Sequence, residues 1–153
     1  MTEPYRDTAV PVERSKQQIR NCLKNAGARG MQLEETWDTD GLVEVCLVRF
    51  LWLPESSTVP IKVRLEAKPL PPEKRTDYRG GWKVTPEQRE RQAWRGLAWY
   101  LESLVKAATF GIVPFEAVFL AYFEDVRGRT IGEHLIPMIE SGKLALPAMG
   151  GTS

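Results

Sequence analysis

The sequence has few of the residues from which metal sites and nucleophilic active sites are built. Its 153 residues include one histidine, His134, and two cysteines, Cys22 and Cys46, without close spacing. This pattern provides neither a disulfide framework nor the three or four protein ligands of a zinc site. A phosphate-binding glycine loop and a nucleophile elbow are also missing. We therefore expect no metal, no cofactor and no enzymatic activity.

Long hydrophobic runs are missing as well. No stretch approaches the roughly 20 apolar residues that cross a bilayer, and the N-terminal MTEPYRDTAVPVERS has no apolar signal core. We expect a cytoplasmic protein that makes no membrane contact. Residues 1–11 are expected to form a flexible arm and residues 148–153 a flexible tail, on either side of a single domain over residues 12–147.

The chain has almost no net charge, with 21 basic and 20 acidic residues. No overall field would therefore draw it to nucleic acid or to an anionic membrane. The charges are nevertheless distributed unevenly. Residues 30–67 contain 3 basic and 7 acidic residues, whereas residues 68–95 contain 8 basic and 4 acidic residues. Positive charge is thus concentrated in the second of these segments.

Hydrophobic periodicity predicts an α+β fold. Apolar residues at helical spacing predict a short N-terminal helix over residues 12–26. Alternation at period two then predicts a three-stranded antiparallel meander, with a tight turn at residues 38–41 between the first two strands. A long central helix is expected to cover the apolar face of this sheet, followed by short C-terminal helices. The expected strands are 31–37, 42–52 and 59–67, the basic connection is 68–84, and the long helix is 85–111.

The long helix has clear start and stop signals. Thr85 can cap its first turn, Pro86 suits the first helical position, and Gln88 stands where a capping-box partner belongs. Gly111 supplies a left-handed stop. Trp99 falls on the charged side, where we expect the C-terminal helices to bury it. The opposite stripe is predicted to face the core and contains Trp94, Leu97, Ala98, Leu101, Leu104, Val105 and Ala108.

Two short helices are predicted after the long one. Pro114 opens the first, and Thr130 with Glu133 forms a capping box that begins the second. The second helix is expected to kink near Pro137 and to end at Gly142. We expect both helices to pack on the long helix.

The C-terminal half carries a set of recognisable groups: Trp94-Arg95, Gly111-Ile112, Phe115-Glu116, Phe119-Leu120-Ala121, Gly128, Thr130, Gly132-Glu133, Pro137, Gly142 and Leu146-Pro147. With these groups, residues 12–147 resemble a family of small uncharacterised proteins encoded by bacteriophages, prophages and plasmids. The resemblance implies a mobile-element origin and a bacterial host cell, and it brings no established activity. The family carries lysines at the positions of Glu102 and Leu104 and an aliphatic residue at Trp99. This departure argues against a shared nucleic-acid surface on the outer side of the long helix.

Basic and aromatic residues interleave along the connection and the start of the long helix. Cationic side chains neutralise phosphates, and aromatic rings stack on unpaired bases. A solvated loop that Trp82 anchors to the core would explain the same pattern, and this interpretation stays open. The leading hypothesis is nucleic-acid binding, single- or double-stranded and with modest affinity, through Lys74, Arg75, Tyr78, Arg79, Trp82, Lys83, Arg89, Arg91 and Arg95.

The alternative hypothesis is a protein-binding module that modulates a host or phage enzyme. The chain contains five tryptophans, and aromatic residues are favoured at the centres of protein interfaces. The partner surface would include Trp99 on the long helix, or Lys62 and Arg64 on the outer face of the sheet. The order helix, three strands, helix also resembles the double-stranded RNA-binding domain, but its lysine cluster is missing and the connection is far longer.

Overall fold

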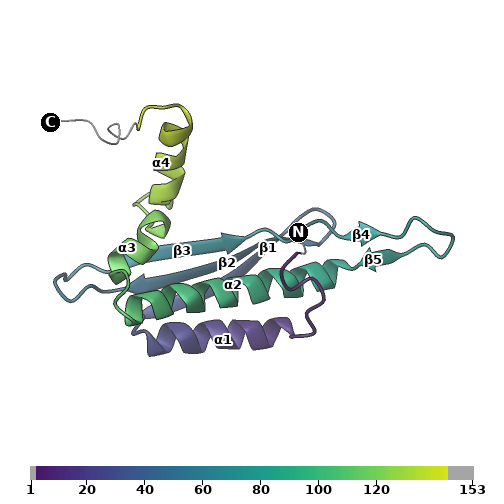
Figure 1. Cartoon of the computed structure of the whole chain (residues 1–153), viewed down its shortest axis with the longest axis horizontal. Helices are drawn as coiled ribbons and strands as arrows, with labels where there is room; N and C mark the ends of the chain where they lie inside the picture. The colour runs from purple at the N-terminus through teal and green to yellow at the C-terminus, as the bar shows by residue number, and fades with distance from the viewer. Residues whose placement is uncertain (1–2, 145–153) are drawn as a thin grey trace.

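The computed structural model describes residues 3–144 and has the α+β architecture that the sequence predicts (Figure 1). Two helices lie side by side on one face of a three-stranded sheet, and a small hairpin extends beyond one end. No helix within this range is long and apolar enough to span a bilayer. In chain order the elements are α1 (Val12–Asn25), β1 (Gly30–Trp37), β2 (Val43–Trp52), β3 (Ile61–Ala67), β4 (Glu73–Lys74), β5 (Trp82–Val84), α2 (Pro86–Thr109), α3 (Phe115–Phe119), the 3-10 helix η1 (Leu120–Tyr122) and α4 (Ile131–Glu140).

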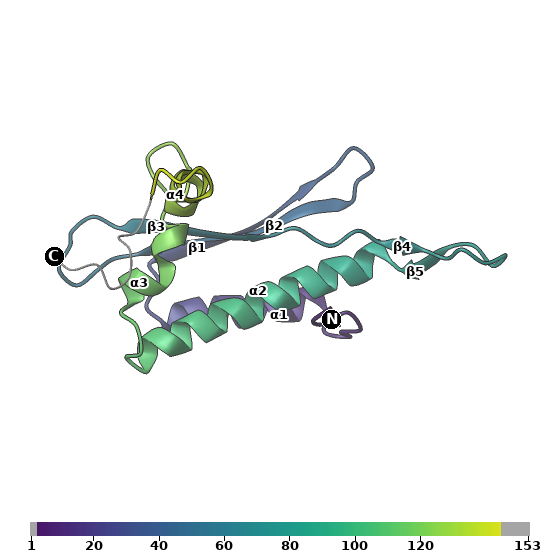
Figure 2. The same ribbon diagram turned by 45° about the horizontal axis from the view of Figure 1, so that its top comes forward.

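The sheet has the order β1-β2-β3 with antiparallel pairing throughout. Because side chains alternate between the faces of a strand, its two faces differ in character. The inward face buries an apolar set that includes Cys46, Val48, Phe50, Val63 and Leu65. The outward face is mixed: β1 and β3 contribute polar residues, whereas β2 contributes Leu47 and Leu51 on either side of Arg49. One row across this face pairs Gln32 with Arg49 and Arg49 with Arg64. The helices cover the inward face (Figure 2).

Helix α2 contributes the largest part of the core. The Thr85 hydroxyl accepts a hydrogen bond from the Gln88 backbone N–H at 3.1 Å, which confirms the predicted cap. The expected capping box is wrong, because the Gln88 side chain donates instead to two backbone carbonyls of the N-terminal segment. The predicted apolar stripe faces the core, and its first half is buried: Trp94, with no accessible surface, Leu97, Ala98 and Leu101. Its second half is only partly buried: Leu104, Val105 and Ala108. Helix α1 packs beside α2 and buries Ile19 and Leu23 against the same core.

The N-terminal segment differs from the flexible arm expected over residues 1–11. From residue 3 onward it lies against the start of α2. The Gln88 amide donates to the carbonyls of Arg6 (2.7 Å) and Thr8 (2.9 Å), and the Gln92 amide donates to that of Pro4 (2.8 Å). These contacts join residues 80 to 88 positions apart, so the sequence pattern of the segment alone does not reveal them. The tail expected over residues 148–153 lies outside the described residues.

The basic connection over residues 68–84 contains an element that the sequence did not predict. Strands β4 and β5 pair as an antiparallel hairpin that extends past the end of α2 (Figures 1 and 2). The Arg75 N–H donates to the Gly81 carbonyl at 2.9 Å and closes the hairpin. Gly80 and Gly81 both have positive φ angles, of 62° and 75°, a backbone conformation that favours glycine. The connection is therefore a structured arm.

The C-terminal helices take two different positions. Helix α3 packs against α2, as expected, and its Phe119 is buried with its ring 5.4 Å from that of Phe50. The chain then passes the edge of β3, where Phe123 forms a bridge with Val63. Helix α4 consequently lies against η1, so the expectation that it packs on the long helix is wrong. Its capping box, formed by Thr130 and Glu133, is confirmed.

Candidate nucleic-acid interface

The hairpin brings most of the predicted nucleic-acid-binding residues together. We call residues 74–83 the basic arm; it contains four basic residues and one acidic residue. Tyr78 stands at its tip with 98% of its surface exposed, and Trp82 is 38% exposed. The Lys74 ammonium lies 5.4 Å from the centre of the Trp82 ring, within the range of a cation–π contact. The remaining cationic residues of the arm are also exposed: Arg75, Arg79 and Lys83.

The arm holds one internal ion pair. Arg79 donates to the Asp77 carboxylate at 2.8 and 3.0 Å. Such a pair at the surface contributes little stability, about 0 to 1 kcal/mol, so Arg79 can exchange Asp77 for a phosphate at small cost. A hollow of about 610 Å³ lies beside this pair, with Lys74, Arg75 and Lys83 in its lining. An anionic group placed there would meet several cations.

Arg89 does not belong to this surface, and its assignment as a nucleic-acid-binding residue is wrong. Its side chain is 3% exposed. Its guanidinium contacts Glu3 at 2.6 Å and Glu73 at 3.2 Å, and it donates to the Pro71 carbonyl at 2.9 Å. The hydrogen bond from Arg89 lowers the pKa of Glu3. Arg89 thus fastens the base of the arm and the N-terminal segment to α2, and its donors are not available to phosphate.

Arg91 and Arg95 lie on the body of the molecule, each with a contact of its own. Arg91 donates to the Gln88 side chain at 2.8 and 3.1 Å. Arg95 donates to the side chain of Gln18 on α1, and its guanidinium lies 5.7 Å from the Tyr5 ring. Both arginines are partly exposed. The nine predicted residues therefore divide into six on the arm, two on the body and the buried Arg89.

The residues of the alternative partner surface also separate. Trp99 is 55% exposed, so the expectation that the C-terminal helices bury it is wrong. Lys62 is exposed on the outer face of the sheet. Arg64, beside it, is largely covered and contacts Glu133 at 2.6 Å and Glu66 at 3.2 Å. Arg64 is therefore not free to bind a partner.

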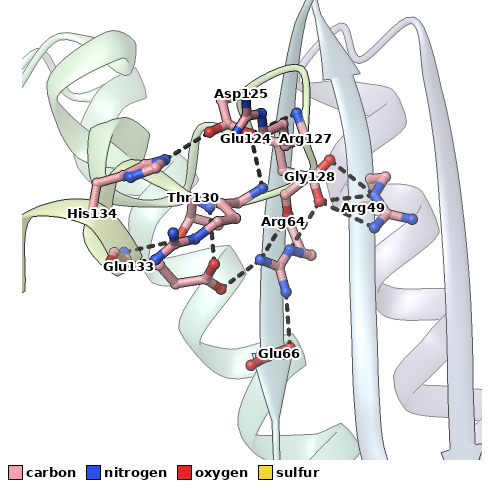
Figure 3. Close-up of polar contacts among 11 residues, drawn as sticks. Arg49, Arg64, Glu66, Glu124, Asp125, Arg127, Gly128, Thr130, Glu133 and His134 are labelled. Carbon is pink, nitrogen blue, oxygen red and sulfur yellow. Dashed lines mark hydrogen bonds and ion pairs between the residues drawn. The ribbon is translucent and has the colours of Figure 1, made fainter.

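An ionic cluster on the outer face of the sheet was not predicted (Figure 3). The Glu124 side chain is 3% exposed. One of its carboxylate oxygens, Oε1, accepts hydrogen bonds from both Nε and Nη2 of Arg49, each at 3.1 Å. Arg64 Nε lies 2.9 Å from the same oxygen without an aligned hydrogen bond, so this contact is ionic. The cluster attaches the chain before α4 to β2 and β3. Arg49, a lone cation in an apolar stretch of β2, was its only sequence signal.

His134 pairs with Asp125 at the edge of this cluster (Figure 3). Its Nε2 lies 2.7 Å from the Asp125 carboxylate. The hydrogen bond from His134, aided by the backbone N–H groups of Arg129 and Arg127, lowers the pKa of Asp125 to about 2. This pair holds the start of α4 against the preceding turn.

A second ionisable cluster lies between the sheet and the helices. Glu35 points inward from β1, and it accepts a hydrogen bond from the Trp94 indole N–H at 2.8 Å and contacts the Lys16 ammonium at 3.2 Å. Burial opposes the ionisation of Glu35, but these contacts lower its pKa. Burial, together with the nearby charge of Glu35, raises the pKa of Glu90 to about 7. Burial also raises the pKa of Cys46 to about 12, so this thiol is not a nucleophile at neutral pH.

Among residues 3–144, no group of three or more histidine, cysteine, aspartate or glutamate side chains is arranged to hold a metal ion. Comparison of the chain with protein-family models, curated proteins and solved structures gives no match. The basic arm and the surfaces around it are therefore the features of the molecule that point to a function.

Proposed function

We propose that the protein is a non-catalytic accessory protein of a phage or other mobile element that binds nucleic acid through the basic arm. The observation that carries the proposal is the extension of the arm beyond the body (Figure 2). Its cations are exposed, and so is Tyr78 in the turn between β4 and β5. An isolated surface patch would offer only charge. An extended two-stranded ribbon can also enter a groove or follow a strand.

The shape and chemistry of the arm suit nucleic acid. The major groove of a DNA duplex accepts a two-stranded β-ribbon, and β4 with β5 forms such a ribbon. Lysine and arginine neutralise phosphates, while an exposed tyrosine or tryptophan stacks on an unpaired base and contributes about 1 to 3 kcal/mol. The Lys74 contact keeps the Trp82 ring against the arm, so Tyr78 is the better placed of the two aromatics for stacking.

The affinity is expected to be modest and sensitive to salt. The arm offers up to four phosphate contacts, so the logarithm of the duplex binding constant should fall with the logarithm of salt concentration with a slope of about −3 to −4. The chain as a whole has a net charge of +1, so long-range attraction adds little. Binding should be clear at low salt and weak at physiological salt.

Replacing Arg75 and Lys83 together with alanine should weaken binding of short oligonucleotides about tenfold or more at about 50 mM salt and reduce the salt slope by about 2, because two phosphate contacts are lost. Fluorescence titration with single- and double-stranded oligonucleotides measures both quantities. The matched control replaces two exposed cations distant from the arm, Arg127 and Lys143, with alanine. It changes the net charge equally and should leave binding close to that of the unchanged protein.

Two results would contradict the proposal. One is the absence of binding to either form of nucleic acid at low salt. The other is an equal loss of binding in the arm variant and the control, which would mean that only the overall charge matters. A loss restricted to the Tyr78→Ala variant with single strands would indicate base stacking at the tip.

Exposure of Trp99 supports the second candidate, binding of a host or phage enzyme. Trp99 lies on α2 beside Tyr100, which is also exposed, and tryptophan is enriched among the residues that dominate interface energies. If this function holds, the protein should retain a specific partner from host lysate, and Trp99→Ala should abolish that retention while Arg75→Ala leaves it unchanged. Recovery of nothing above background, even at low salt, would count against it.

A further inference from the structure

The end of the molecule that carries the basic arm also carries a hairpin of opposite charge. We call residues 34–44, the turn between β1 and β2 with its flanking residues, the acidic hairpin. Residues 30–48 contain no lysine or arginine. Figure 2 shows the acidic hairpin and the basic arm extending from the same end of the molecule and diverging from one another. Its exposed acidic residues are Glu34, Asp38, Asp40 and Glu44.

The acidic hairpin has few partners within its own chain. Among residues 3–144, no ion pair joins the acidic hairpin to the basic arm. One exposed carboxylate of the hairpin forms an ion pair with a residue outside it: Glu34 lies 3.8 Å from Arg49. Asp38 serves the turn itself, because its carboxylate accepts the N–H groups of Asp40 (2.9 Å) and Leu42 (3.0 Å). Trp37, at the end of β1, is 61% exposed. The hairpin thus presents negative charge and an aromatic ring to solvent.

We propose that these two hairpins form the contact between two copies of this chain, the acidic hairpin of each copy lying against the basic arm of the other. In a two-fold symmetric pair, any contact of one surface with another is repeated in reverse. Because both hairpins lie at the same end of the molecule, a single two-fold axis places each acidic hairpin against the basic arm of the other copy.

Charge complementarity favours a second copy over other occupants. A partner of one sign, such as nucleic acid or a basic protein, is attracted to one hairpin and repelled by the other. A second copy presents the complementary sign to each. The exposed aromatics Trp37, Tyr78 and Trp82 lie on the same two hairpins, and aromatic residues are enriched at the centres of interfaces.

The pairing is expected to be weak and to depend on salt. Exposed charges are screened, with a Debye length of about 10 Å at 0.1 M ionic strength and about 3 Å at 1 M. Two small hairpins also bury less surface than the interfaces of obligate dimers. Sedimentation at protein concentrations up to about 100 μM should therefore show dimer at about 50 mM salt and mostly monomer at about 1 M salt.

Charge reversal tests the pairing directly. One variant reverses the acidic hairpin with Glu34→Lys, Asp40→Lys and Glu44→Lys, and retains Asp38 because it stabilises the turn. The other reverses the basic arm with Lys74→Glu, Arg75→Glu and Lys83→Glu. Each variant alone presents two hairpins of the same sign and should sediment as a monomer. An equimolar mixture of the two variants should form a one-to-one dimer, because each hairpin then meets a hairpin of opposite charge. Thermal unfolding of each variant alone verifies that it is folded.

This inference can be tested separately from nucleic-acid binding, although both partners would compete for the basic arm. The acidic-hairpin variant keeps the arm intact, so it should lose dimerisation while binding oligonucleotides as well as, or more tightly than, the unchanged protein. Sedimentation of the unchanged protein as a monomer at low salt would overturn the inference. A mixture of the two folded variants that associates no better than either alone would do the same, whatever the outcome with nucleic acid.

Discussion

Replacing Trp94 with alanine is expected to lower the free energy of unfolding by about 3 to 5 kcal/mol, the range for truncating a buried aromatic side chain. Trp94 has no solvent-exposed surface and lies where α1, α2 and the sheet meet. Its loss leaves a large cavity. It also removes the hydrogen bond to Glu35 and the ring over which Lys16 lies at 4.9 Å, so the remaining carboxylate loses a partner in a half-buried site. Urea unfolding followed by circular dichroism measures the change.

The matched control for this prediction is Trp99→Ala on the same helix. It removes the same side chain from a position that is 55% exposed, so the loss should be below about 1 kcal/mol, as for most surface substitutions. Equal losses of unfolding free energy in the two variants would contradict the placement of Trp94 in the core and of Trp99 at the surface. A small loss at Trp94 alone would mean that the surrounding side chains close the cavity.

Local patterns account for what could be predicted. The 3.6-residue repeat of α2 identified Trp94, Leu97 and Leu101 as core, because a helix brings residues three and four apart to the same face. The period of two in β3 likewise separated Val63 and Leu65 from their outward neighbours. These signals arise within a few residues of one another. The α+β fold and the α2 cap at Thr85 could therefore be predicted from the sequence alone.

The candidate site was only partly predictable, because its geometry depends on residues far apart in the sequence. Arg89 and Arg91 have similar local sequence contexts. Arg89 is nevertheless buried, among contacts that include Glu3, 86 positions away. Glu124 meets Arg49 across 75 positions. The path of the chain after α3 decides whether Trp99 is covered, and nothing near Trp99 in the sequence encodes that path. The basic composition of the arm could be seen, but not its hairpin form.

Between about pH 5 and pH 8 the protein should become less stable as pH rises, and Glu90→Gln should remove most of that dependence. The pKa of Glu90 is about 7 in the folded protein, against an ordinary value of 4.5. The folded state therefore binds more protons than the unfolded state between these values, and its stability falls as pH rises through this window and levels off above it. A shift of this size corresponds to about 3 kcal/mol if fully expressed. Because Glu90 is partly exposed, we expect about 1 to 2 kcal/mol after solvent screening.

Three charged neighbours act on the pKa of Glu90. Glu35 on β1 and Glu87 on α2 disfavour its ionisation, whereas Lys16 on α1 favours it. The lowered pKa of Glu35 acts in the opposite sense and below this window, since its stabilisation is lost as pH falls below its ordinary value of 4.5. Urea unfolding across the pH series should show Glu90→Gln more stable than the unchanged protein at about pH 8 and similar to it at about pH 5. Glu116→Gln, which removes an exposed carboxylate on α3, should retain the full pH dependence. If it loses that dependence as well, or if Glu90→Gln keeps it, the proton is bound elsewhere than between β1 and α2.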